Sequence, residues 1–96
     1  MVDDTLEERG QVYGEFEHNG RIAQLLKNVA RGSSGWGRLQ YDQKEALEMI
    51  LHKIARIVNG DPNYVDSWTD IAGYARLIER RLEQEDLYEG PLKHSD

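Results

Sequence analysis

Residues 52–75 read HKIARIVNGDPNYVDSWTDIAGYA, and two helical patterns meet within them at Asn59-Gly60-Asp61-Pro62. Before this turn, apolar residues recur at helical spacing at Leu47, Ile50, Leu51, Ile54 and Val58. After the turn, a second stripe follows at Trp68, Ile71, Ala75, Ile78 and Leu82. A short connection between two long helices makes them antiparallel neighbours. The stretch therefore predicts a helical hairpin.

Local signals predict where these two helices begin and end. The run Asp42-Gln43-Lys44-Glu45 has the form of a capping box, which predicts a helix start at Asp42. Gly60 is a candidate left-handed C-terminal cap. Asp66 is the natural N-cap of the last helix, which should end before Gly90-Pro91.

The rest of the chain adds one long and one short helix. A helix is predicted from Glu15 or Asn19 to Arg31, ended by Gly32-Ser33-Ser34-Gly35, and its apolar stripe is Ile22, Leu25, Leu26 and Val29. A capping box at Thr5-Leu6-Glu7-Glu8 predicts a short helix within residues 1–10, and residues 88–96 are expected to form a loose tail. The predicted fold is one all-α domain over residues 1–96, a small antiparallel bundle of a short N-terminal helix plus three main helices. The helix ending at Arg31 should cover the remaining apolar edge of the hairpin.

Composition limits the classes of function. The 96 residues are 39% hydrophobic and 31% charged with a net charge of -6, which argues against a protein that binds duplex nucleic acid. No apolar run approaches the roughly 18 residues that suggest a membrane span. Cysteine is absent, and the N-terminus MVDDTLEERG lacks the features of a signal peptide, so we expect a cytoplasmic protein of a bacterium or of an infected host.

Residues 21–40 form a basic segment inside this acidic chain. Arg21, Lys27, Arg31 and Arg38 occur there without any acid. Such a segment can hold a small anion, although an ordinary solvated helix face would have the same composition.

The outer helix faces carry a second pattern. Glu45, Met49, His52 and Arg56 share the side of their helix opposite its apolar stripe. They predict a homo-oligomer with ligand pockets where protomers meet. The alternative is that they are ordinary amphipathic surface residues.

Two sets of residues are candidates for chemistry. Carboxylates at Glu45, Glu48, Asp66 and Asp70 lie at spacings that could hold Mg²⁺, as in all-α pyrophosphohydrolases of the MazG kind, but such spacings also occur on solvated helices. Tyr13 beside the flexible Gly14 can stack on a nucleobase, and Lys27 on the next helix can meet a phosphate. A tyrosine in this position can also pack against its own protein.

Several segments together resemble a family of small phage proteins. They are Val12-Tyr13-Gly14-Glu15-Phe16, Arg21-Ile22-Ala23-Gln24 with Lys27, residues 43–50, residues 52–57, Gly60-Asp61-Pro62 and residues 66–75. The resemblance covers nearly all of residues 7–82. The group includes phage anti-CBASS proteins, sponges that bind cyclic oligonucleotide messengers and so prevent activation of bacterial CBASS effectors.

The resemblance implies a compact helical protomer in a hexamer, without a cofactor or catalysis. Cyclic dinucleotides such as 3′,3′-cGAMP would lie between protomers, with separate sites for cyclic trinucleotides. In that family a tyrosine near the N-terminus stacks on a base and a lysine on the following helix contacts phosphate, and Tyr13 and Lys27 match these positions. Arg56 and Arg76, on outer helix faces, are further candidates. The alternatives are the pyrophosphohydrolase and a structural phage assembly component.

Overall fold

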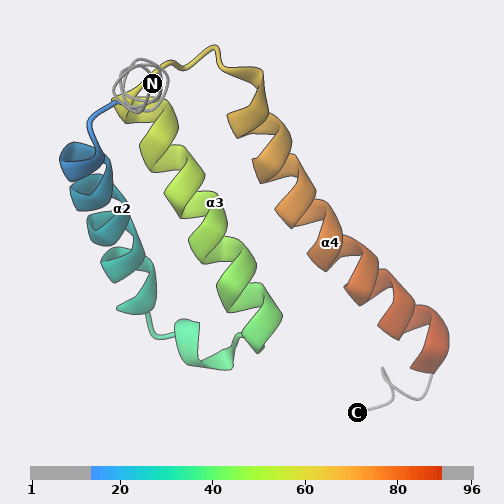
Figure 1. The fold of residues 1–96 in the computed structure, drawn as a ribbon. Helices are drawn as coiled ribbons and strands as arrows, with labels where there is room; N and C mark the ends of the chain where they lie inside the picture. The colour runs from blue at the N-terminus through green and yellow to red at the C-terminus, as the bar shows by residue number, and fades with distance from the viewer. Residues whose placement is uncertain (1–13, 90–96) are drawn as a thin grey trace.

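A computed structural model describes residues 14–89 of the protein, and this part of the chain is helical without strands (Figure 1). Its elements are α2 (Phe16–Arg31), a short 3-10 helix η1 (Trp36–Arg38), α3 (Tyr41–Asn59) and α4 (Val65–Glu89). The predicted all-α class and the three main helices are confirmed. The short helix predicted within residues 1–10 lies outside the described residues. The first two residues of the expected loose tail, 88 and 89, belong to α4, and the others lie outside the described range.

The three long helices form one open layer with α3 in the middle. Helix α3 runs antiparallel to α2 on one side and to α4 on the other (Figure 1). The prediction that α2 would cover the apolar edge of the α3–α4 pair is therefore wrong. The radius of gyration is 17.1 Å, whereas a compact domain of this length has one of roughly 12–13 Å. Within residues 14–89, no further helix covers either face of this layer.

Side chains in the connection between α3 and α4 form local hydrogen bonds. The Asp61 carboxylate accepts a hydrogen bond from the backbone N–H of Asn63 at 2.9 Å. The Trp68 indole donates one to the carbonyl of Pro62 at 2.8 Å. The predicted hairpin is confirmed, but two of its predicted caps are wrong. Gly60 has φ -133° and is not left-handed, and α4 begins at Val65, so that Asp66 lies within its first turn.

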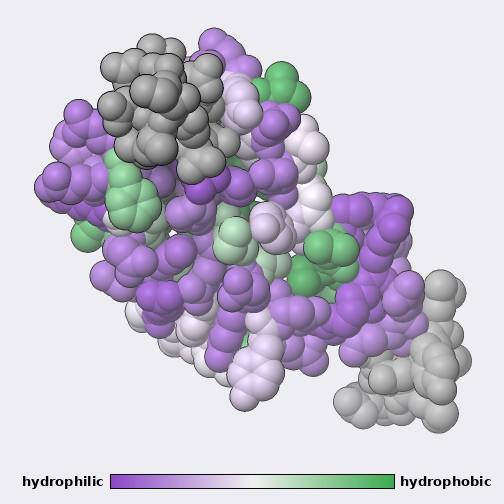
Figure 2. All heavy atoms as spheres, viewed as in Figure 1, coloured by the Kyte–Doolittle hydropathy of each residue, from purple (hydrophilic) through white to green (hydrophobic). Residues whose placement is uncertain are grey.

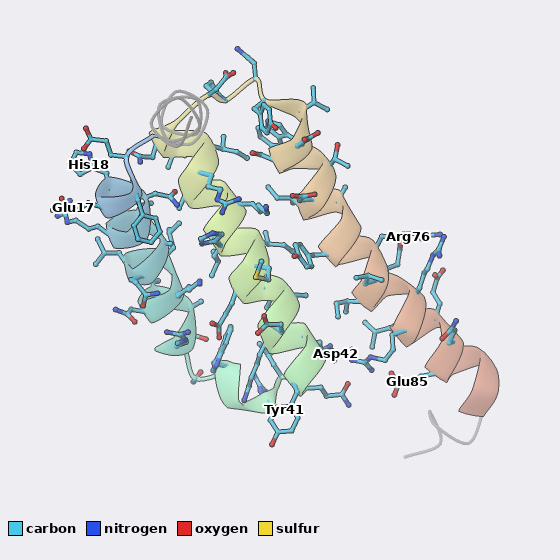
Figure 3. The ribbon with its side chains drawn as sticks, in the orientation of Figure 1. Glu17, His18, Tyr41, Asp42, Arg76 and Glu85 are labelled. Atoms are coloured by element: carbon cyan, nitrogen blue, oxygen red, sulfur yellow. The ribbon has the colours of Figure 1, made fainter. Side chains whose placement is uncertain are left out.

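The start of α3 also differs from the prediction. Gln40 is the N-cap, and its backbone N–H donates to the side-chain oxygen of Gln43 at 2.9 Å. Asp42 lies inside the first turn, where Arg81 of α4 donates two hydrogen bonds to its carboxylate, at 2.6 and 2.7 Å. Asp42 thus joins two helices instead of capping one (Figure 3).

Replacing Arg81 with alanine should loosen the second half of α4. We expect amide hydrogens after about residue 76 to exchange faster in Arg81→Ala, while those of the turn stay protected. The matched control is Arg80→Ala, because Arg80 is an exposed neighbour of the same charge. Equal exchange in both variants would show that the Arg81–Asp42 pair does not hold α4.

The same pair should respond to acid. The hydrogen bond from Arg81 is the main reason that the pKa of Asp42 lies below its usual value of 3.8. The stabilisation from this pair is therefore complete above that usual value and is lost as the pH falls through the lowered pKa. Faster exchange of α4 at acid pH should accordingly be absent from Arg81→Ala, which lacks the pair already.

The buried core of the described chain is small. Its buried apolar residues are Ala23, Ala46, Ala55 and Ile57. Ala55 is completely buried, on the helix that packs against both α2 and α4. Among residues 14–85, no large side chain is fully buried.

Residues predicted for the core instead reach the surface. Helix α2 buries Asn19 and Ala23, while Val29 of its predicted stripe is 77% exposed. The predicted stripe residues Leu25, Leu47, Val58 and Trp68 are also exposed. Apolar side chains interrupt the hydrophilic surface over α2 and where α4 lies beside α3 (Figure 2). Periodicity correctly identified amphipathic helices but not which face each helix turns to its neighbour.

Candidate anion-binding site

Positive charges from α2 and α3 gather around His52. Helix α3 places His52 and Arg56 one turn apart, and Lys27 comes from the antiparallel α2. Lys27 and Arg56 both lie close enough to His52 to act electrostatically on its imidazole. The structure thus brings together two residues that the sequence nominated separately for ligand binding.

The surroundings of His52 lower the pKa of its imidazole. Its pKa lies below the usual 6.5, and partial burial, which disfavours the charged ring, is the largest cause. The positive charges of Arg56, Lys27 and Lys53 follow in that order. These effects favour the neutral form of the imidazole.

The cations of this cluster differ in their partners. The Lys53 ammonium lies 2.8 Å from the Asp70 carboxylate, and its side chain is only 13% exposed, so its charge is largely neutralised within the protein. Lys27 takes part in none of the ion pairs found among the side chains of residues 14–85. We call Lys27, His52 and Arg56 the cationic cluster.

The chain just after Tyr13 is held against the end of α3 that carries Arg56. Gly14 has a φ of +80°, a conformation that glycine adopts without strain. The Asn59 side chain donates a hydrogen bond to the carbonyl of Glu15 at 3.1 Å. Tyr13 itself lies outside the described residues.

Arg76 lies apart from the cationic cluster. Its side chain points away from α3 on the outer face of α4 (Figure 3). It pairs there with Glu79 and lies 3.9 Å from Glu83. Within one protomer, the structure does not bring it together with Lys27 and Arg56.

The four carboxylates considered for Mg²⁺ have other neighbours. Glu48 pairs with Arg31 at 2.5 Å, and Asp70 pairs with Lys53. Asp66 accepts a hydrogen bond from the Tyr64 hydroxyl at 3.2 Å, while Glu45 is exposed. No group of three or more His, Asp or Glu side chains among the described residues is arranged to hold a metal ion.

None of the described helices is long and apolar enough to span a bilayer.

Comparison with known proteins gives a family. The family model described as domain of unknown function DUF6378 matches residues 3–82. The chain belongs to this family. Its description states no activity, substrate or partner.

One relative of this DUF6378 chain is a phage protein. The Gene 55 protein of Mycobacterium phage D29 is 35% identical over 96 residues, which cover 97% of this chain and 59% of the relative. The chain therefore spans about three fifths of the length of that relative. A phage origin is supported by this match. No solved structure gives a significant match.

The sequence placed His52 of this DUF6378 chain on an outer helix face expected to form ligand pockets, but it did not name His52 as a ligand contact. Lys53 was not singled out, and its pairing with Asp70 depends on the packing of α4 on α3. Elsewhere on α2, Asn19 is buried, and its side-chain oxygen has no hydrogen-bond partner among the described residues.

Proposed function

We propose that the protein binds cyclic oligonucleotide second messengers and sequesters them without cleaving them. Its ligands would be cyclic dinucleotides such as 3′,3′-cGAMP, with cyclic trinucleotides at separate sites. It would act in the cytoplasm of the infected bacterium, where removal of the messenger blocks activation of CBASS effectors. The observation that supports this most is the cationic cluster, a local concentration of positive charge in a chain of net charge -6.

The chemistry of the ligand suits the residues in question. A cyclic dinucleotide offers two phosphate charges and two π faces, so a binding site needs a few cations and aromatic surface. In this proposal Lys27 and Arg56 contact phosphate and Tyr13 stacks on a base. Arg76 points away from the cluster of its own protomer, so its role requires that a neighbouring protomer supply it.

We further propose that the protein works as a homo-oligomer, a hexamer if the family resemblance holds. Large apolar side chains are exposed on all three helices of the described layer, including Phe16, Val58 and Leu77. Their burial between protomers would add roughly 25 cal/mol of stabilisation per Å² of apolar surface removed from water. Contacts of this kind would also close pockets that an open layer cannot form alone.

The phage relative is consistent with a role in immune evasion. The name of that relative, Gene 55 protein, states no activity. Because this chain spans only 59% of that relative, any shared activity is part of the proposal.

Calorimetric titration tests the proposed function. We expect 3′,3′-cGAMP or cyclic tri-adenylate to bind the purified protein, and heating the complex should return the intact ligand. A fragmented ligand would identify a phosphodiesterase instead of a sponge. Absence of binding by both ligands would refute the proposal, and Mg²⁺-dependent release of pyrophosphate from nucleoside triphosphates would favour the MazG-like alternative.

A further inference from the structure

Ion pairs between neighbouring helices divide the open surface of α3 into two faces. On one side, Glu48 pairs with Arg31 of α2 at 2.5 Å. On the other side, Lys53 pairs with Asp70 of α4 at 2.8 Å. At about 100° per residue, Glu48 and Lys53 project about 140° apart, which leaves a narrow and a wide sector of α3 between its neighbours. The narrow sector carries Glu45, Met49, His52 and Arg56 and defines the polar face of the layer, while the wide sector carries Leu47, Ile50, Leu51, Ile54 and Val58 and defines its apolar face.

Helices α2 and α4 turn their apolar stripes to the same face as α3. Helix α4 faces α3 with the buried Ser67 and the half-buried Ile71, and α2 faces it with the buried Asn19 and Ala23. On each of these antiparallel helices, the apolar stripe lies about a quarter turn from that inward side. The view in Figure 2 is of the polar face, where hydrophilic side chains predominate. The apolar face thus also includes Trp68, Ala75 and Leu82 of α4 and Ile22, Leu25, Leu26 and Val29 of α2.

The apolar face is open within the described chain and carries little charge. Val29 is 77% exposed, Val58 65% and Leu47 41%, and no helix within residues 14–89 covers them. The residues of this face on α2 and α3 are uncharged, and Glu79, which lies among its α4 residues, pairs with Arg76. Two such faces can therefore meet with few like charges between them.

We propose that the apolar face binds a second copy of this chain, so that two protomers pack layer on layer. This inference rests on the homo-oligomer proposed above, because it names the surface through which two protomers meet. It does not depend on messenger binding. The sequence suggested a different contact surface, formed by Glu45, Met49, His52 and Arg56, but these residues lie on the polar face and take no part in this contact.

The incomplete core of one protomer identifies a matching layer as the partner. Helical domains bury their apolar faces between two packed layers, and one protomer supplies a single layer whose buried apolar residues are few. A second copy supplies a layer of the same apolar character. A two-fold axis would bring the same face of both copies together, which is the commonest arrangement of soluble homo-oligomers. A strongly charged partner would find little complementary charge on this face.

The size of the apolar face also fits a stable pair. The 19 residues of α3 make a helix about 28 Å long, and three helices side by side at about 8–10 Å spacing are roughly 25–30 Å wide. Their common face thus covers roughly 700–850 Å², close to the roughly 800 Å² per partner that a standard protein interface buries.

Sedimentation of the full chain over a range of concentrations tests the pairing. We expect the parent to be a dimer or a larger even-numbered oligomer. Val58→Glu should weaken the pairing by at least about 100-fold, because it buries a carboxylate without a partner. The matched control is Leu77→Glu, since Leu77 is also 65% exposed but lies on α4 toward the polar face. Pairing as strong in Val58→Glu as in the parent, or an equal loss in both variants, would overturn the inference.

Methyl NMR of the unaltered protein covers the case in which Val58→Glu does not fold. A soluble paramagnetic agent broadens methyl groups that solvent reaches. In one protomer Val58 and Leu77 are equally exposed, so the inference predicts much less broadening at Val58 than at Leu77. Equal broadening at both would overturn it.

The outcomes separate this inference from the proposed function. A monomeric parent would overturn both the pairing and the proposed homo-oligomer. A pair that depends on Val58, in a protein that binds neither 3′,3′-cGAMP nor cyclic tri-adenylate, would support the inference and refute the messenger sponge. Messenger binding by an oligomer that is unchanged in Val58→Glu would overturn the inference and leave the sponge intact.

Discussion

Lys27→Ala is expected to weaken binding of 3′,3′-cGAMP by about 10- to 100-fold, the effect of losing one hydrogen bond to a charged group. Among the described residues, Lys27 has no ion pair that would compete with the ligand. It also acts on His52, so its removal takes away one charge from the centre of the cationic cluster. Lys27→Glu should abolish binding, because it places a carboxylate where the phosphate would lie.

The matched control is Lys44→Ala. Lys44 lies in the first turns of α3, with its ammonium 5.9 Å from the centre of the Tyr41 ring, and it does not contribute to the field at His52. Both variants change the net charge of the chain equally. Calorimetry at one fixed ionic strength should therefore show full binding by Lys44→Ala. An equal loss in both would indicate a general charge effect, and unchanged binding in Lys27→Ala would remove this residue from the site.

The sequence predicted the hairpin well because its turn is built from local preferences. Gly60, Asp61 and Pro62 disfavour a continuing helix whatever surrounds them, and the Asp61 side chain closes the turn as expected of an aspartate in such a position. The predicted cap at Asp42 was wrong because Gln40, two residues earlier in the same segment, forms a capping box of the same kind with Gln43. The partner that occupies Asp42 is Arg81, which lies 39 residues away along the chain.

Predicting the candidate site required information that periodicity does not contain. Lys27 and Arg56 could each be nominated from residue type and helix face. Their convergence around His52 depends on the register of α2 against α3, which small side chains such as Ala23 and Ala55 set. On α2 the prediction placed Val29 in the core because valine is more hydrophobic than alanine, whereas the buried residue is Ala23 and Val29 is exposed. In an open layer of helices, the most apolar face of a helix need not pack against the neighbouring helix of the same chain.

Gly14→Ala is expected to destabilise the protein by about 2–5 kcal/mol. A non-glycine residue at a positive φ costs about 1–2 kcal/mol, and overpacking typically adds about 1–3 kcal/mol. At Gly14 both effects apply, because φ is +80° and a Cβ would overlap the backbone oxygen of Asn59 and lie 2.5 Å from its side-chain nitrogen. Urea denaturation measures the change. Since domains are commonly stable by only about 5–15 kcal/mol, such a loss would be a large share of the total.

Gly20→Ala makes the comparison informative, because the same methyl group should act in the opposite direction there. Gly20 lies inside α2, and a Cβ at this position meets no atom within 4 Å. Alanine should stabilise the protein by up to about 1 kcal/mol through its higher helix propensity.

If Gly14→Ala were as stable as Gly20→Ala, the chain at residue 14 would not be held against Asn59. The expected contrast would instead show that this contact fixes the residue following Tyr13 at the end of α3, one turn from Arg56. Gly14→Ala should then also weaken messenger binding under conditions where it remains folded, whereas Gly20→Ala should leave it unchanged.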